Sequence, residues 1–437
     1  MLTILAYSMV VVFMTLIMTK RLPAVVALIV VPIIFGLIAG FSIDELGPMM
    51  LEGVSKLAPT GVMLMFAILY FGIMIDAGLF DPIIRVILKL VGGDPMKIVV
   101  GTAALAMTVG LDGDGSTTYM VTAAAMLPLY DRLRISKLVF ACVVMMAGHN
   151  MNLLPWGGPT ARATSALSLD IGDVFVPLIP AMIITGIWVL VVAYILGMRE
   201  RRRLGTLSLD GDVDHAVEVV TEHDTSLLRP NLLWFNALLT LGLLVALVMA
   251  LAPLPILFMV AFAIAVSVNY PGLTAQKERT EAHAQNVLPV VALIFAAGIF
   301  VGILSGTKMV DAIAESVIGA VPYWLGPYMG IVTAVLSIPF TFFISNDAFY
   351  FGILPILAKT AAVYGFSPAE IARASLIGQQ VHLLSPLVAS TYLLVGLAKV
   401  EFGDHQRFTL LWALSAAAVM LAATLLLGIV PIVGSPS

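Results

Sequence analysis

Cysteine and charge are the scarcest features of this chain. Its 437 residues include one cysteine, Cys142, and only 11% of them are charged. A single cysteine excludes an internal disulfide and a cysteine-based metal cluster. The net charge of -4 argues against a nucleic-acid partner. The low charged fraction also leaves too little polar surface for a soluble domain of this length.

Apolar residues dominate the composition instead. They make up 61% of the chain, and the mean hydropathy is +1.07. Segments of about 20 apolar residues cross a hydrocarbon core of about 30 Å as helices. The apolar segments do not alternate as barrel strands would, so we expect an all-α polytopic membrane protein. Leu2 to Met18 lacks a basic n-region and precedes Lys20-Arg21, which indicates a first span and not a signal peptide.

The chain carries an internal repeat with a period of about 230 residues. A shift of 230 superimposes these pairs: Pro23 on Pro253, Pro59 on Pro289, Gly72-Ile73 on Gly302-Ile303, and Asp81 on Asp311. Between the halves lies a charged stretch that begins with Arg199 to Arg203 and continues with scattered acids. The predicted units are a first transmembrane repeat at 1–197, a cytoplasmic linker at 198–230 and a second transmembrane repeat at 231–437.

The number of crossings in each half predicts how the halves insert. The expected spans of the first half are Leu2 to Met18, Ala24 to Phe41, Ala58 to Phe80, Leu138 to Leu154 and Val174 to Gly197. A re-entrant hairpin is expected around Asp112. Each repeat therefore has about five spanning helices, one re-entrant hairpin and one broken helix. Because five is odd, the second repeat must insert upside down, as in many secondary transporters.

The basic residues test this topology. With a hairpin at Asp112, most of them fall on one side of the membrane, including the cluster Arg199 to Arg203. A full crossing there would place Arg132, Arg134 and Lys137 on the opposite side. The sequence thus predicts a bacterial-type plasma-membrane protein with both termini extracytoplasmic and the central linker cytoplasmic.

Four polar interruptions break the apolar segments at comparable places in the two halves. They are the tips at 112–118 and 345–347 and the broken helices at 148–162 and 379–390. Opened helices present unpaired N–H groups and a positive dipole end, which favour anions. Arg162 offers a bidentate partner for a carboxylate. The candidate substrate-binding residues are Ser116, Thr117, Thr118, Asn150, Asn152, Gly157, Gly158, Arg162, Ser345, Asn346, Gln380 and Ser385.

Acidic residues at the same places conflict with a bare anionic cargo. Asp112, Asp114 and Asp347 would repel it unless a divalent metal or protons neutralise them. Hard oxygen ligands suit Mg2+ or Ca2+, carried with the substrate and not held as a resident cofactor. His149 and His382 join Asp112 and Asp114 as candidates for proton coupling.

Several motifs resemble a known family. These are Phe13 to Arg21, Phe66 to Asp76, Leu111 to Tyr119 and Pro155 to Arg162, which look like the citrate-metal/proton symporters (CitMHS) of the ion transporter superfamily. The resemblance covers nearly the whole chain. It implies proton-coupled uptake of citrate complexed with a divalent metal, by a homodimer whose transport region moves as an elevator.

The resemblance also implies roles for the two tips. Ser116-Thr117 and Ser345-Asn346 would clamp the carboxylates. Asp347 is a departure, since carboxylate carriers of the wider superfamily often have a small hydroxyl residue there. The distribution of metal and carboxylate contacts is therefore left open.

Other functions are compatible with parts of the pattern. A proton- or sodium-coupled carrier of another organic acid, such as a dicarboxylate or gluconate, needs the same kind of pocket. An ion channel would need a continuous pore, whereas paired hairpins fit alternating access better. An intramembrane hydrolase using Asp112 and Asp114 as a dyad is disfavoured, because the second tip carries one acid. The sequence thus predicts a transporter and not an enzyme.

Overall fold

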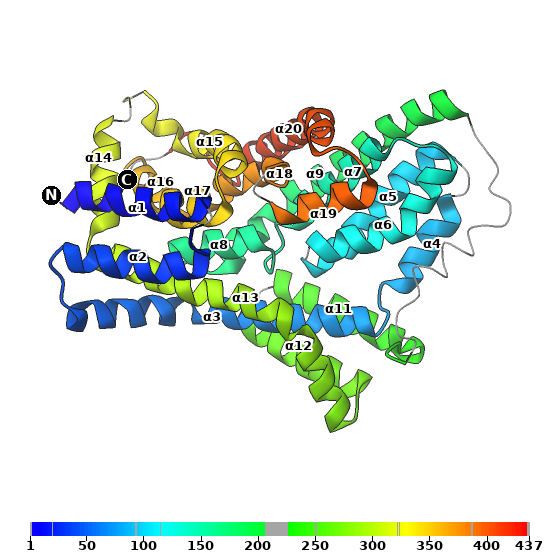
Figure 1. The fold of residues 1–437 in the computed structure, drawn as a ribbon, viewed down its shortest axis with the longest axis horizontal. Helices are drawn as coiled ribbons and strands as arrows, with labels where there is room; N and C mark the ends of the chain where they lie inside the picture. The colour runs from blue at the N-terminus through cyan, green and yellow to red at the C-terminus, as the bar shows by residue number, and fades with distance from the viewer. Residues whose placement is uncertain are drawn as a thin grey trace.

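The computed structural model describes residues 2–19, 21–91, 94–113, 115–205, 226–249, 251–320, 322, 324–385 and 388–434, and within them it is helical with no strand. This agrees with the all-α prediction. The helices of the first half are α1 (Leu2–Met18), α2 (Ala24–Ile38), α3 (Ile43–Asp76), α4 (Asp81–Val91), α5 (Pro95–Val109), α6 (Gly115–Arg132), α7 (Lys137–Met151), α8 (Gly158–Leu167) and α9 (Ile171–Leu204). Their arrangement is shown in Figure 1.

The second half begins after a 3-10 turn at Pro230–Leu232. Its helices are α11 (Leu233–Val248), α12 (Leu254–Asn269), α13 (Leu273–Gly306), α14 (Met309–Ala320), α15 (Met329–Phe343), α16 (Leu354–Ala362), α17 (Pro368–Ser375), α18 (Gln379–His382), α19 (Ala389–Ala398) and α20 (Phe402–Leu426). Residues 206–225 of the predicted linker lie outside the described residues.

Some helices have the same length at comparable places in the two halves. The third helix of each, α3 and α13, has 34 residues. The helices that follow the two breaks, α8 and α19, each have 10 residues. Both end on a non-glycine residue in the left-handed region, Ser168 and Lys399, each with φ of 53°. These matches agree with the period of about 230 residues in the sequence, and the duplication stays a prediction.

Helix α3 is longer than its hydropathy predicts. The span expected to begin at Ala58 begins at Ile43, because Ser42 and Glu45 form a capping box in which the Ser42 N–H donates to Glu45 Oε2 over 2.7 Å. The first turns also carry an ion pair of Lys56 with Glu52, four residues apart. Caps and side-chain pairs thus extend this helix beyond the apolar stretch that was expected to span the membrane.

Helices α3 and α13 pack against each other in antiparallel directions (Figure 1). Glycine makes this contact close: a Cβ at Gly53 would lie 2.0 Å from the Gly298 carbonyl oxygen, and one at Gly302 would lie 2.2 Å from the Met49 carbonyl oxygen. Further along the pair, Gly72 contacts the ring of His283. The pairing of early α3 with late α13, and of late α3 with early α13, fixes the antiparallel direction.

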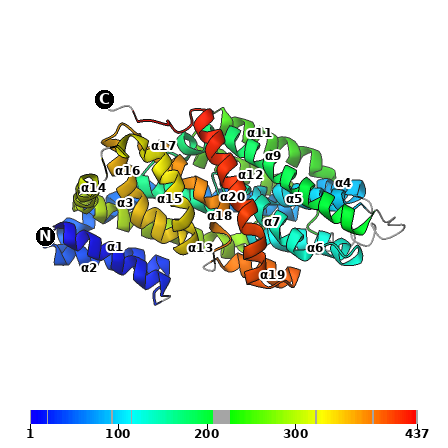
Figure 2. The ribbon, with the colours of Figure 1, turned by 90° about the horizontal axis from the view of Figure 1, so that it is seen from above.

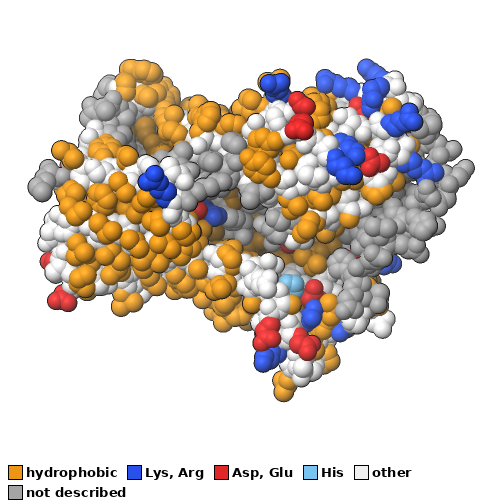
Figure 3. All heavy atoms as spheres, in the orientation of Figure 1, with side chains coloured by type: hydrophobic (Ala, Val, Ile, Leu, Met, Phe, Trp, Pro, Cys, Tyr) orange, Lys and Arg blue, Asp and Glu red, His pale blue; other side chains and the backbone are white. Residues whose placement is uncertain are grey.

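Seven helices within the described residues are long and apolar enough to cross a membrane. Hydrophobic side chains cover the end of the molecule around α1 to α3, whereas charged side chains gather at the opposite end and at the junction of α12 and α13 (Figure 3). Viewed from above, α20 crosses over α18 and α7 and packs on both (Figure 2). α18 also packs against α7, so the helices that precede the two breaks lie side by side.

Candidate functional site

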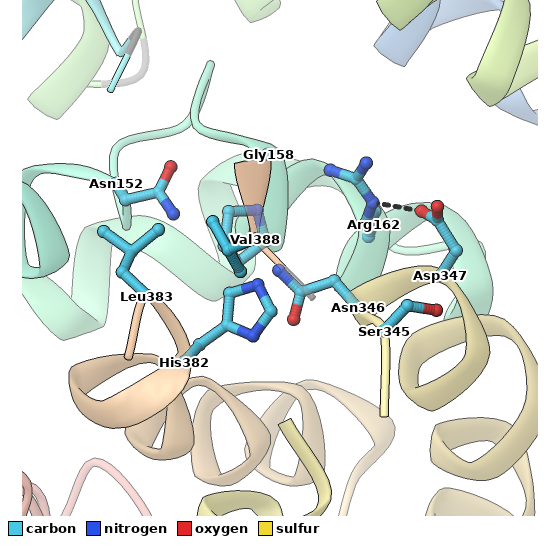
Figure 4. Close-up of a pocket in the computed structure, with 10 residues that line it drawn as sticks. Asn152, Gly158, Arg162, Ser345, Asn346, Asp347, His382, Leu383 and Val388 are labelled. Carbon is cyan, nitrogen blue, oxygen red and sulfur yellow. Dashed lines mark hydrogen bonds and ion pairs between the residues drawn. The ribbon is translucent and has the colours of Figure 1, made fainter. Parts of the chain in front are cut away.

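A polar cavity of about 250 Å³ lies where the first broken helix meets the second tip (Figure 4). Residues from both halves of the chain line it. They are Asn152, Gly158, Pro159, Arg162, Ser345, Asn346, Asp347, His382, Leu383 and Val388.

The break between α7 and α8 forms one wall of the cavity. α7 ends at Met151, and a tight loop leads to α8 at Gly158. Thr160 donates its hydroxyl to the Leu153 carbonyl oxygen over 2.8 Å, which closes the loop. A Cβ at Gly157 would lie 2.0 Å from the Asn152 carbonyl oxygen, so this turn requires glycine. The loop brings Asn152 and the N-terminal turn of α8 to the cavity.

The second tip forms the opposite wall. After α15, the Ser345 hydroxyl accepts from the Ala348 N–H over 3.2 Å, and a π-helical turn follows at Ala348–Ile353. π-helical turns are frequent at functional sites. The Asn346 amide pairs with Gln379, whose Nε2 donates to Asn346 Oδ1 over 2.9 Å and to the Tyr350 hydroxyl over 3.0 Å. Gln379 thereby fixes the orientation of Asn346 at the cavity.

An ion pair crosses the cavity between the two halves. Arg162 Nε on α8 donates to Asp347 Oδ1 over 2.6 Å, as the dashed line in Figure 4 marks. The two side chains are 23% and 18% exposed, so water screens them only in part. The sequence assigned Arg162 to a substrate carboxylate and Asp347 to a metal or proton. In the structure each is the partner of the other.

His382 places one ring nitrogen against the backbone and its ring against the cavity (Figure 4). Its Nδ1 lies 2.6 Å from the Thr341 carbonyl oxygen. A carbonyl oxygen only accepts, so Nδ1 carries the hydrogen, and in the neutral ring Nε2 is the basic nitrogen. The ring can thus take up a proton at Nε2 without losing the bond that orients it.

The first tip packs on the loop between α7 and α8. A 3-10 turn, Gly110–Asp112, contains the buried Asp112 and ends at Gly113, whose φ is 79°. Trp156 Nε1 donates to the Leu111 carbonyl oxygen over 2.9 Å. A Cβ at Gly113 would lie 2.6 Å from Trp156 Cδ1, so only glycine allows this contact.

Of the remaining predicted residues, those that the structure describes do not line this cavity. Asn150 lines a second, apolar cavity. His149 is buried and accepts the Leu383 N–H over 3.0 Å, and Gln380 is buried with Nε2 at 3.3 Å from Met420 Sδ. Ser385 is buried beyond His382, and Thr117 and Thr118 lie in α6. Asp114 and the Ser116 side chain lie outside the described residues.

Five residues in or beside the cavity were not among the predicted site residues: Pro159, Tyr350, Gln379, Leu383 and Val388. Gln379 was passed over for its neighbour Gln380, because a sequence does not fix which of two adjacent amides faces inward. Pro159, Leu383 and Val388 have apolar side chains, and a single tyrosine hydroxyl does not distinguish Tyr350 from a packing residue in an apolar segment. Within the described residues, no three His, Cys, Asp or Glu side chains gather to hold a metal.

The fold defines a class of protein before any family is considered. Solved transporters share it: YdaH of Alcanivorax borkumensis, described as having an unusual topology, gives a TM-score of 0.60 at 17% identity over 87% of this chain and 86% of that one. MtrF of Neisseria gonorrhoeae, from a class of antimetabolite efflux pumps, gives 0.61 at 14% identity over 90% and 86%. The chain is a polytopic membrane protein with a transporter fold.

The sequence then identifies the family. The citrate transporter family model matches residues 13–378. A Bacillus subtilis citrate transporter is 60% identical over 98% of this chain and its own full length. The Mg(2+)/citrate complex secondary transporter of the same organism is 52% identical over 99% of this chain and its full length. The chain belongs to the citrate transporter family, as its motifs predicted, and it is a transporter and not an enzyme.

Proposed function

We propose that this protein is a secondary active transporter that imports citrate as a complex with a divalent cation, together with protons, by alternating access. The observation that carries the proposal is the Arg162–Asp347 ion pair across a cavity built by both halves. The substrate named for the relative that is 52% identical supports the metal complex.

The ion pair explains how one site accepts both an anion and a cation. A carboxylate of citrate competes with Asp347 for Arg162, since both are planar acceptors of the same guanidinium. Asp347, once released, is an oxygen ligand of the kind that Mg2+ prefers. The metal enters as part of the substrate. Binding therefore exchanges one partly buried ion pair for two, and the single negative charge of the bound complex is left for protons to balance.

Proton coupling follows from the charge of the cargo. A fully ionised citrate with one divalent cation carries a single negative charge, so uptake into a negative interior requires compensating cations, and we propose that these are protons. His382 Nε2 faces the cavity as a basic nitrogen, with Nδ1 held by Thr341. It is the group we propose to carry a proton, and Asp347 is its acidic neighbour in the same cavity.

The proposed topology has two inverted repeats, extracytoplasmic termini and a cytoplasmic linker. The antiparallel packing of the equivalent helices α3 and α13 supports the inversion. The proposed re-entrant hairpins rest on the placement of the basic residues and not on length, because α5 and α15 with their adjoining 3-10 turns form 18-residue segments that are long and apolar enough to cross a membrane. The homodimer and the elevator motion implied by the family stay predictions.

Uptake of labelled citrate into proteoliposomes tests the function. We expect accumulation that requires Mg2+ or another divalent ion, stops on adding a chelator, and is driven by an inward proton gradient. Separate proton and sodium gradients, with citrate, a dicarboxylate and gluconate as cargo, discriminate the related carriers. Undiminished citrate uptake in excess chelator would contradict transport of citrate as a metal complex. Uptake driven by a sodium gradient alone would contradict coupling to protons.

A further inference from the structure

The turn that ends α18 carries two neighbouring residues of the polar cavity, His382 and Leu383 (Figure 4). The peptide group between them is hydrogen-bonded on both sides. Its carbonyl oxygen accepts the Ser385 N–H over 2.8 Å, and its N–H, which belongs to Leu383, donates to His149 Nε2 over 3.0 Å. The orientation of this peptide determines where both side chains lie at the cavity, so its two hydrogen bonds position part of the site.

His149 supports this turn from the other half of the chain. It lies near the end of α7, and its side chain is fully buried. Leu383 lies 234 residues further on, in the second broken helix. The hydrogen bond therefore links the two broken helices, in addition to the ion pair of Arg162 with Asp347 that links the first broken helix to the second tip.

The hydrogen bond also fixes which nitrogen of His149 carries hydrogen. A backbone N–H only donates, so Nε2 is the unprotonated acceptor, and the hydrogen of the neutral ring lies on Nδ1. Nδ1 is buried and has no hydrogen-bond partner among the described residues. A proton added at Nε2 would set two donors against each other and break the bond to Leu383. His382 differs, because its orienting bond is made by Nδ1 and survives protonation of Nε2.

From this geometry we infer that His149 is a positioning residue of the substrate site, which acts as a hydrogen-bond acceptor and not as a proton carrier. Its Nε2 holds the peptide between His382 and Leu383, and through that peptide both side chains, in the orientation that binds the substrate. His149 itself does not touch the substrate. The inference rests on the proposed citrate site, and of these two histidines it assigns proton uptake to His382.

Three substitutions of His149 separate the acceptor from the shape of the side chain. His149→Gln supplies an amide oxygen near the place of Nε2. His149→Met has nearly the shape of glutamine but only a weak acceptor, and His149→Phe keeps a ring without an acceptor. Citrate exchange and proton-driven net uptake in proteoliposomes are measured for each. We expect the KM for citrate to rise about tenfold in His149→Met and His149→Phe, equally in both assays, and to stay within about twofold in His149→Gln.

The order of these variants distinguishes three roles of His149. A positioning acceptor requires glutamine to serve better than methionine or phenylalanine. A packing role would favour phenylalanine, which replaces the ring best, and that order would overturn the inference. Citrate exchange without net uptake in His149→Gln would overturn it too, because it would show a proton carrier. His405→Gln and His405→Phe are the control and should keep KM, because His405 is equally buried but its ring nitrogens lie beside Met145 Sδ and the Thr409 hydroxyl.

A measurement without transport separates this inference from the proposed function. The chain has six histidines, so the signals of isotope-labelled histidine that disappear in His149→Gln identify His149. In detergent, at the pH of the uptake assay, we expect proton–nitrogen correlation spectra to show hydrogen on Nδ1 and none on Nε2. Hydrogen on Nε2 would overturn the inference even where citrate is transported. If the unsubstituted protein does not transport citrate, the proposed function fails, while hydrogen on Nδ1 alone still supports the acceptor role of His149.

Discussion

At the scale of single residues, the polar cavity is organised by groups that are already paired. Arg162 is held by Asp347, Asn346 by Gln379, and His382 by the backbone of α15. Such pairing keeps polar groups tolerable at membrane depth while no substrate is bound. A substrate must then replace the hydrogen-bond and ion-pair partners of these side chains. Recognition therefore depends on the geometry of the substrate's carboxylates.

Arg162→Lys tests the role of the guanidinium. Lysine keeps the charge but loses the planar donor pair, so we expect the KM for citrate to rise about tenfold or more with little loss of protein. Initial rates in proteoliposomes measure it. Glu52→Gln is the matched control, because it breaks an ion pair whose side chains are 67% and 54% exposed and should leave KM unchanged. An unchanged KM in Arg162→Lys would remove Arg162 from the substrate site.

His382→Gln tests the proposed role of His382 in proton coupling. Glutamine keeps a donor near the Thr341 carbonyl oxygen but has no basic nitrogen, so the variant should still exchange internal for external citrate. Net uptake driven by a proton gradient should fall at least tenfold. Measuring both activities separates coupling from binding. Loss of exchange together with net uptake would indicate a structural role instead.

At the scale of helices, small residues determine how closely the two halves approach. The contact of α3 with α13 depends on Gly53, Gly298 and Gly302, which lack the side chains that would separate the backbones. Apolar helices gain no hydrophobic free energy from each other in lipid, so close packing is what stabilises this pair. The capping box at Ser42 sets where α3 begins and thus where each glycine meets its partner.

Gly53→Ala and Gly47→Ala form a matched pair within α3. A Cβ at Gly53 meets the Gly298 carbonyl oxygen, whereas one at Gly47 has nothing within 4 Å. We expect Gly53→Ala to destabilise the protein by about 1–3 kcal/mol through overpacking. Gly47→Ala should be neutral or slightly stabilising, since alanine favours helix. Thermal unfolding in detergent measures both, and equal Tm values would contradict the close contact.

At the scale of the whole molecule, α3 and α13 lie antiparallel, and each tip packs beside a broken helix of the other half. The second tip meets α8, and the Gly115 end of the first tip lies close to Ser390 on α19. The proposed inverted duplication accounts for this reciprocal arrangement. It also gives a carrier two comparable gates around one central region.

Site-directed labelling tests the inversion. Cys142 is buried, so Cys142→Ser supplies a background without cysteine. Asp44→Cys and Thr274→Cys then mark the N-terminal turns of α3 and α13, which are equivalent positions in the two halves. We expect a membrane-impermeant maleimide to label Asp44→Cys in intact cells and Thr274→Cys only after lysis. Labelling of both from outside would exclude inverted repeats.

The sequence alone determined the membrane class, the helical fold and the family, and it indicated a repeat. Hydropathy indicates whether a segment faces lipid or water. The order of prolines and glycines can be compared between the two halves from the sequence alone. It also located most of the residues that line the polar cavity, since ionisable and helix-breaking residues are conspicuous among apolar ones. It did not show that α3 begins before its apolar stretch, because Ser42 and Glu45 extend a helix without being apolar.

Only the tertiary structure decided which residues share a space. Asn150 and Asn152 are two positions apart, yet they face different cavities, because α7 ends between them. Likewise, no local pattern reveals that Arg162 and Asp347, 185 residues apart, neutralise each other. Which residues of the two halves become partners depends on how the helices pack. That packing rests on glycine contacts and helix ends, whose effect appears only when the chain is folded.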